Sequence, residues 1–174
     1  SSDLWSVKAS PKDQGKDYWY VEDGAIVCHT RGDTDHGYIW LQSDETFGDF
    51  ELRLQFQAAA DNQGNSGVQI RSRWDPDATV DGEGQARGWL DGPQIDIHPP
   101  TPWRTGFIYD ETREHRRWIF PDLTDWRIDK ETYAPRRVVY FEKNEEPYWN
   151  DLRIRARGTR ITTWVNNVKV ADYD

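Results

Sequence analysis

The sequence lacks several features that would place a protein in a familiar class. It holds one cysteine and no methionine among 174 residues, so a disulfide within the chain is excluded. The lone Cys28 ends a short apolar run, and we expect it to be a small core residue. No apolar run approaches the roughly 20 residues that a membrane-spanning helix requires, so we predict no membrane span.

The overall charge of the chain also argues against nucleic acid and anionic membrane surfaces as partners. Its 22 Lys and Arg residues face 31 Asp and Glu residues, which gives a net charge of -9. Nucleic acids and anionic membrane surfaces bind proteins through basic patches. We therefore expect neither as a partner.

Aromatic residues are what the sequence has in abundance. It contains 10 Trp, 8 Tyr and 6 Phe, although 30% of its residues are charged. A disordered chain of the same charge would lack those aromatics. The length fits one folded domain over residues 1–174, long enough to bury a core.

Short alternating runs separated by turn residues dominate the chain. Residues 50–57 alternate strictly between apolar and polar, and residues 152–157 do the same. Asp23-Gly24 is a typical hairpin turn between two such runs, and Asn166-Asn167 predicts a second tight turn. We find no pattern for a helix longer than a turn or two. Many short strands predict an all-β sandwich or barrel.

Three glycine-led runs carry most of the polar side chains that fit a site: residues 65–71, 92–98 and 106–111. A strand turns successive side chains to opposite faces. We therefore expect Gln69 and Arg71 to share a face, and Gln94, Asp96 and His98 likewise to share a face. Asp96 and Arg71 should then face one cleft, with Glu111 at its rim. Amides, carboxylates and a guanidinium on a sheet surface suit a hydroxyl-rich ligand.

These runs occur in an order that resembles the 3-keto-disaccharide hydrolase family, formerly catalogued as a domain of unknown function. The resemblance also rests on Trp149 to Gly158 and on Trp164 to Asp172. It implies a concanavalin A-like jelly-roll β-sandwich of two antiparallel sheets. The resemblance also implies further strands past the last turn, which we expect to be truncated here or supplied by a separate chain. We expect another chain segment or subunit to complete the sandwich.

The resemblance also implies a chemistry. A keto group at C3 of a glycoside acidifies the neighbouring C2–H, a base removes that proton, and the aglycone leaves from C1. Such a site needs a base, a cation or donors for the enolate oxygen, and a proton donor. We predict the base or a metal ligand in Asp96, the enolate partner in Arg71, and an acid or ligand in Glu111.

We further expect Gln94, Gln69, Tyr109, His98 and Trp103 to contact the substrate. Trp103 is one of six tryptophans that fall outside the predicted strands, the others being Trp74, Trp89, Trp118, Trp126 and Trp149. We expect one or two of the six to line the site, where a flat indole ring can stack on a sugar.

Structural interpretations stay open for each of these residues. Asp96 would pair with Arg71 or Arg73 on a solvated face, Arg71 would form a cross-strand salt bridge, and Glu111 would cap a turn. His98 precedes two prolines and would then lie at an exposed strand end. The tryptophans outside the predicted strands would, in the alternative interpretation, cover the edge of the hydrophobic core instead of binding sugar.

A metal site has only compositional support. Asp33, Asp35 and His36 form one acidic patch, and the loop between Asp75 and Asp91 is rich in carboxylates. Oxygen ligands of this kind suit Ca²⁺, although the spacing matches no EF-hand. We leave the metal unassigned, with Ca²⁺ as the candidate ion.

Two classes of function remain after these observations. One is an enzyme that cleaves 3-keto-glycosides, with a carbohydrate or glycoside as substrate. The other is a noncatalytic carbohydrate-binding or surface-assembly module on the same fold, because one architecture serves many functions. The chain starts at Ser1 without methionine, which we interpret as a removed leader or a trimmed start. We expect a secreted or periplasmic protein.

Overall fold

A computed structural model of the chain provides the structure. It describes residues 4–57, 65–79, 88–98, 104–113, 115, 117–121, 142–143, 146–147 and 149–174. Within these ranges the regular elements are strands and one short 3-10 helix, with no α-helix. The all-β prediction is confirmed. No helix in these ranges is long and apolar enough to cross a membrane.

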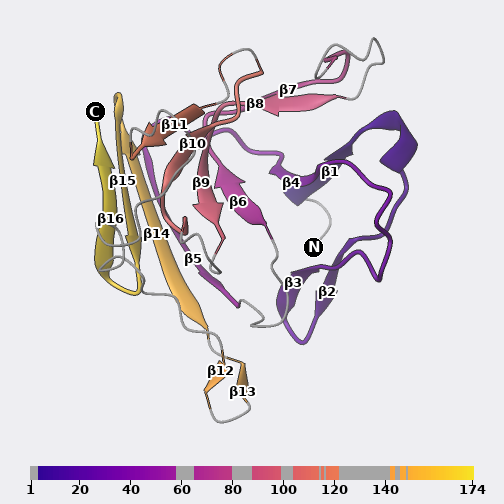
Figure 1. Cartoon of the computed structure of the whole chain (residues 1–174), viewed down its shortest axis with the longest axis horizontal. Helices are drawn as coiled ribbons and strands as arrows, with labels where there is room; N and C mark the ends of the chain where they lie inside the picture. The colour runs from indigo at the N-terminus through magenta and orange to yellow at the C-terminus, as the bar shows by residue number, and fades with distance from the viewer. Residues whose placement is uncertain are drawn as a thin grey trace. The chain divides into compact units, whose positions relative to one another are not determined.

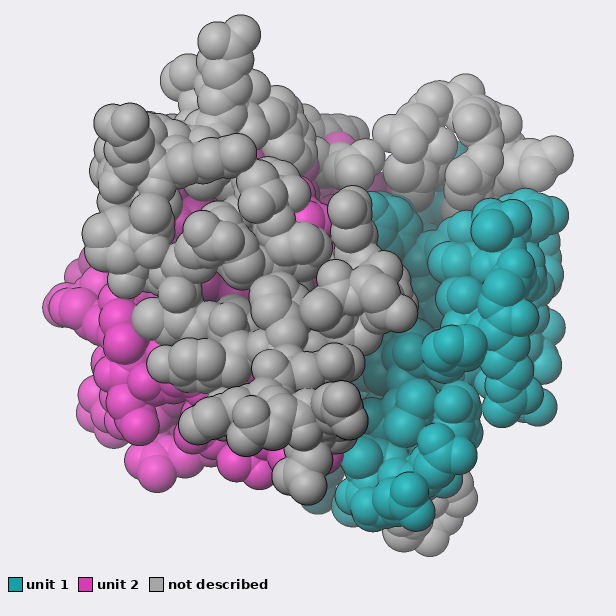
Figure 2. Space-filling view, turned by 60° about the horizontal axis from the view of Figure 1, so that its bottom comes forward, with its two compact units in different colours: residues 1–46, 73–91 teal, residues 47–72, 92–174 magenta. Residues whose placement is uncertain are grey.

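The chain divides into two compact units, coloured separately in Figure 2. Unit 1 comprises residues 1–46 and 73–91, and unit 2 comprises residues 47–72 and 92–174. The sequence prediction of a single domain over residues 1–174 stays a prediction.

Unit 1 is built from two-stranded antiparallel sheets that pair β1 with β4, β2 with β3, and β7 with β8. Its elements are β1 (Trp5–Ala9), η2 (Pro11–Asp13), β2 (Trp19–Glu22), β3 (Ala25–Cys28), β4 (Ile39–Ser43), β7 (Arg73–Asp75) and β8 (Trp89–Asp91). The predicted hairpin turn is confirmed, because Asp23 and Gly24 both have positive φ between β2 and β3.

Two sequence expectations for unit 1 are wrong. Cys28 is exposed at the end of β3 rather than in the core, because this two-stranded sheet turns that face to solvent. Trp74 and Trp89 lie in paired strands rather than in loops. Both indole rings contact Trp40 edge to face, at centroid distances of 5.6 and 5.4 Å. Trp89 and Ala78 form a small buried cluster against which Trp40 packs.

Unit 2 holds two four-stranded antiparallel sheets and one small hairpin (Figure 1). The first sheet has the order β11-β10-β9-β6, and the second has the order β16-β15-β14-β5. The bounds are β5 (Phe50–Phe56), β6 (Ser66–Gln69), β9 (Pro93–Ile97), β10 (Ile108–Asp110), β11 (Arg117–Phe120), β12 (Glu142–Lys143), β13 (Glu146–Pro147), β14 (Asn150–Arg157), β15 (Arg160–Val165) and β16 (Val168–Tyr173).

The apolar faces of the two sheets share one core. Ile95 and Ile108 from the first sheet join Leu152, Ile154 and Val165 from the second in one buried cluster, each with at most 1% of its surface exposed. Strict alternation along β14 produces this, because every second residue points inward. Burying each aliphatic side chain contributes roughly 1.5–3 kcal/mol.

The predicted turn at Asn166-Asn167 is also confirmed, with φ of 48° and 65° between β15 and β16. β5 and β16 form the two edges of the second sheet. The jelly-roll connectivity and the completion of the sandwich by another segment stay predictions.

Candidate active site

Strand β9 presents a row of polar side chains on the face opposite the core. Ile95 points into the core, so its neighbours Gln94 and Asp96 point the other way, as predicted. The backbone of Asp96 is fixed on both sides. Its N–H donates to the carbonyl of Phe107 at 2.9 Å, and its carbonyl accepts from the N–H of Gly106 at 2.8 Å. The backbone that carries the carboxyl group is therefore held in place by hydrogen bonds on both sides.

The Asp96 side chain is buried, with 4% of the residue exposed. Its Oδ1 accepts a hydrogen bond from Gln94 Nε2 at 2.8 Å, and its Oδ2 lies 3.3 Å from Arg104 Nε. Burial raises the pKa of Asp96 to about 6 from an ordinary 3.8, while Arg104 and the Gln94 amide act in the opposite direction. A carboxylate with such a pKa is suited to accept a proton near neutral pH.

Gly67 makes room for the amide that holds Asp96. It lies opposite Asp96 in the pairing of β6 with β9. A Cβ added at Gly67 would stand 2.6 Å from both Cγ and Cδ of Gln94, and 2.9 Å from the Ile95 carbonyl oxygen. Glycine is therefore required here by space rather than by backbone conformation. It lets the Gln94 side chain lie across β6 while it donates to Asp96.

Strand β10 adds a second buried polar row beside the first. Tyr109 pairs with Gln94, and the N–H of Glu111 donates to the Gly92 carbonyl at 3.1 Å, which continues the same ladder by one residue pair. Tyr109 and Glu111 are two residues apart and so share a face. They are 4% and 6% exposed. This register places Gln94, Asp96, Tyr109 and Glu111 on one face of the first sheet, and their roles in a site stay predictions.

Trp118, on the neighbouring strand β11, lies beside Tyr109. It pairs with Tyr109 across β10 and β11, and the two rings meet edge to face at 5.2 Å. The guanidinium of Arg104 lies 5.8 Å from the Trp118 ring centroid. Trp118 thus lies on a strand and not in the predicted loop, and only 4% of its surface is exposed.

The geometry predicted for Arg71 is wrong. Strand β6 ends at Gln69, and Arg71 has a φ of 52°, so the two-residue alternation does not reach it. Its guanidinium donates to the carbonyl of Gly158 and to Asp49 Oδ1 at 3.3 Å. This is the salt-bridge alternative, with Asp49 as the partner.

Arg104 holds the position that sequence analysis gave to Arg71. It lies at the turn between β9 and β10, where its N–H donates to the His98 carbonyl at 3.3 Å. Its Nη2 also donates to Asn65 Oδ1 at 3.3 Å. The sequence signal that could have indicated Arg104 is the short separation along the chain between Asp96 and Gly106. Such a separation is typical of two consecutive strands that pair as a hairpin, with Arg104 in the connection.

The remaining predicted residues fall into three groups. Gln69 pairs with Gln94 across β6 and β9 and is half-buried. His98 follows the end of β9, where its N–H donates to Thr105 Oγ1 at 3.0 Å. Trp103 lies outside the described residues, as does Trp126.

The second sheet anchors the turn that carries Arg104. Thr163 on β15 is fully buried, and its hydroxyl donates to the Gly106 carbonyl at 2.7 Å while accepting from the Ala171 N–H at 3.1 Å. Gly106 has a φ of 88°, and a Cβ there would lie 3.0 Å from Val170. The turn is thus packed directly against the core of the other layer.

Metal-ligating side chains do not converge in the described part of the chain, where no three His, Cys, Asp or Glu residues form a group. Asp33 and Asp35 from the acidic patch accept hydrogen bonds from Lys16 and Lys12 at 2.9 and 2.8 Å. Most of the second acidic loop, residues 80–87, lies outside the described residues. The Ca²⁺ site stays a prediction.

Comparison with known proteins places the chain in a family. No curated protein matches it. A family model described as a 3-keto-alpha-glucoside-1,2-lyase-like domain matches residues 1–174, that is, the whole chain, and the protein therefore belongs to this glycoside-active family.

Proposed function

We propose that the protein cleaves 3-keto-glycosides by elimination, with Asp96 as the base. The observation that carries the proposal is a buried carboxylate with a pKa of about 6, held by an amide on one oxygen and a guanidinium beside the other. Membership of the lyase-like family supports the substrate class. A general base works best when its pKa lies near the operating pH.

The proposed steps use Asp96, the Arg104 guanidinium beside it, and Glu111 at the end of the neighbouring strand of the same sheet. The carboxylate removes the proton from C2, and the C–H electrons move into the C2–C3 bond as the C3 oxygen becomes an enolate. Arg104 offers fixed N–H donors to that oxygen. The enolate then re-forms the C3 carbonyl, the electrons form a C1–C2 double bond, and the C1–O bond breaks. Glu111 is the candidate donor of a proton to the departing aglycone oxygen.

The product of these steps is an unsaturated keto sugar. Addition of water across its double bond gives the net hydrolysis product. Gln94 acts as a positioning residue, because its amide fixes the orientation of the Asp96 carboxyl group. Arg71 has no part in this proposal, since its guanidinium is bound at the turn between β14 and β15. The secreted or periplasmic location stays a prediction.

The test is aglycone release from a chromogenic 3-keto-glucoside. Asp96→Asn keeps nearly the same volume and removes the base, so we expect turnover to fall by roughly 10²-fold or more. Asp17→Asn is the matched control, because Asp17 is an exposed carboxylate in unit 1. Unchanged turnover in Asp96→Asn would remove Asp96 from the mechanism. A wild type that binds the sugar without releasing aglycone would favour the noncatalytic binding module.

A further inference from the structure

The outer face of the second sheet is basic in a chain that is acidic as a whole. Alternation along β14 turns Arg153, Arg155 and Arg157 away from the core. The paired strands add three more cations to the same surface, namely Arg53, Arg160 and Lys169. Arg53, Arg160 and Lys169 have side chains that are 73%, 58% and 56% exposed. The whole chain, by contrast, carries a net charge of -9.

The carboxylates on this face are too few to pair with every cation. Glu51 accepts from both Arg53 and Arg155, at 2.6 and 2.7 Å. Asp172 accepts from Arg160 at 2.8 Å and from Lys169 at 3.0 Å. Each of these two carboxylates therefore serves two cations.

Arg153 and Arg157 have no carboxylate partner in the described part of the chain. In addition, there are two pairs of arginines in which the two members lie directly opposite each other on neighbouring strands. Arg153 pairs with Arg53 across β14 and β5, and Arg157 pairs with Arg160 across β14 and β15. Like charges at directly opposed positions destabilise a sheet. A bound anion at either pair would remove that repulsion.

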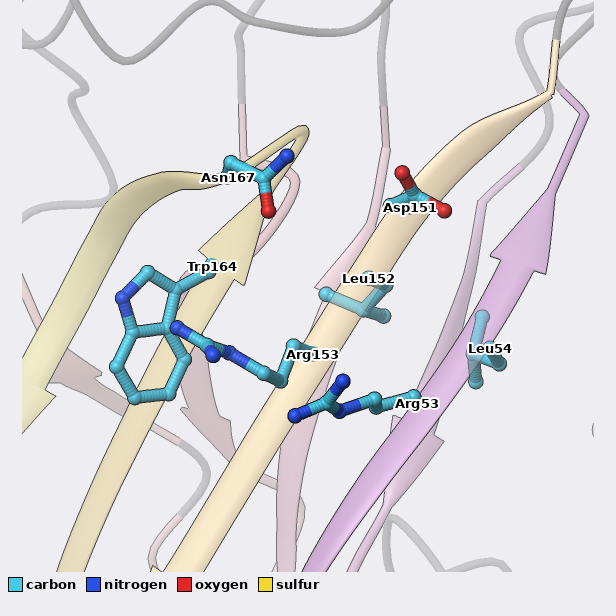
Figure 3. A pocket seen from close by; sticks show the side chains of 7 residues that line it. All are labelled: Arg53, Leu54, Asp151, Leu152, Arg153, Trp164 and Asn167. Carbon is cyan, nitrogen blue, oxygen red and sulfur yellow. The ribbon is translucent and has the colours of Figure 1, made fainter.

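Two shallow hollows flank Trp164 on this face. One, of about 200 Å³, is lined by both opposed arginines, Arg53 and Arg153, and by the polar groups of Asp151 and Asn167. Figure 3 shows the Arg153 guanidinium lying against the Trp164 ring. The Cζ atom of Arg153 is 3.8 Å from the ring centroid. The other hollow, of about 300 Å³, includes Arg157 and Arg160.

We propose that this outer face binds an acidic oligosaccharide, with one anionic sugar in each hollow. Guanidinium pairs fit carboxylate or sulfate groups through planar sets of donors. The carboxylate of Asp151 and the amide of Asn167 suit sugar hydroxyls, which a bare phosphate or a peptide carboxylate lacks. Trp164 lies between the two hollows and would bridge adjacent sugars. The site is separate from Asp96, which belongs to the other sheet, and does not depend on the chemistry proposed there.

Titration calorimetry with three hexasaccharides tests the proposal: a uronate oligomer, a sulfated oligomer and neutral maltohexaose. We expect one or both acidic oligomers to bind and the neutral one not to bind. Arg153→Gln should weaken binding by roughly tenfold or more, since a hydrogen bond to a charged group contributes about 1.5–3 kcal/mol. Arg157→Gln reports independently on the second hollow.

Arg73→Gln is the matched control, because Arg73 is an exposed strand arginine in unit 1. It should leave affinity unchanged, as should Asp96→Asn, which separates this site from the proposed active site. Equal weakening by Arg73→Gln would overturn the proposal, since binding would then follow total charge. Equal affinity for maltohexaose or for a single-stranded oligonucleotide would also overturn it.

Discussion

Asp96 should make the protein less stable as the pH rises, and Asp96→Asn should remove that effect. The folded pKa of about 6 lies above the ordinary value of 3.8, so the folded state binds more protons between these values. The stability that Asp96 contributes is fully present below pH 3.8 and is lost as the pH rises through 6. The full change corresponds to about 3 kcal/mol.

The variant must be compared with the wild type at each pH, because other carboxylates titrate over the same range. We expect the free energy of unfolding of Asp96→Asn, relative to the wild type, to rise by roughly 2–3 kcal/mol between about pH 4 and pH 7. The loss of the charged partner of Arg104 is already contained in this figure, because Arg104 is one of the groups that set the folded pKa of Asp96.

Urea unfolding followed by tryptophan fluorescence at several pH values provides the measurement. The midpoint and slope together give the free energy of unfolding. A difference between variant and wild type that stays flat from pH 4 to pH 7 would show that burial does not raise the Asp96 pKa. A difference of opposite sign would mean that Arg104 dominates, and Asp96 would then be a poor base at neutral pH.

Three further outcomes follow from the same contacts. If Asp96 is the base, kcat/KM for a 3-keto-glucoside should fall as the pH drops through about 6, because the protonated carboxyl cannot accept a proton; a pH-rate profile without that limb would contradict the assignment. Gly67→Ala should displace Gln94 and lower kcat more than it raises KM, whereas Gly48→Ala, where a Cβ meets nothing within 4 Å, should keep both; equal effects would show that the Gln94 contact is irrelevant. Thr163→Val should lower the free energy of unfolding by roughly 1–3 kcal/mol, because it leaves the Gly106 carbonyl and the Ala171 N–H without the hydroxyl; chemical denaturation checks this, and an unchanged midpoint would count against it.

Local alternation predicted much of the fold. The strand at residues 50–57 and the polar row at Gln94 and Asp96 follow from a two-residue period that is visible without any partner strand. The two tight turns follow from residues that tolerate positive φ. Each of these features depends on neighbours within a few positions along the chain.

The errors concern the places where a strand ends or a turn folds back. Alternation was carried two residues too far along β6, which put Arg71 beside Asp96 instead of at Asp49. Arg104 lies in a turn, and only the pairing of β9 with β10 brings it to the carboxylate. Neither strand ends nor turn contacts can be read from periodicity, because both depend on non-local pairing.

The hydroxyl of Thr163 joins the turn between β9 and β10 to the opposite layer, and this has a consequence for local opening. Because this turn is held by the core of the other sheet, it cannot open without disrupting that core. Local opening at Asp96 is therefore tied to opening of the whole unit. The amide protons of Asp96 and Gly106 should therefore exchange with solvent water as slowly as those in the middle of β14. Variation of substrate preference within such a framework would have to arise in segments outside that turn.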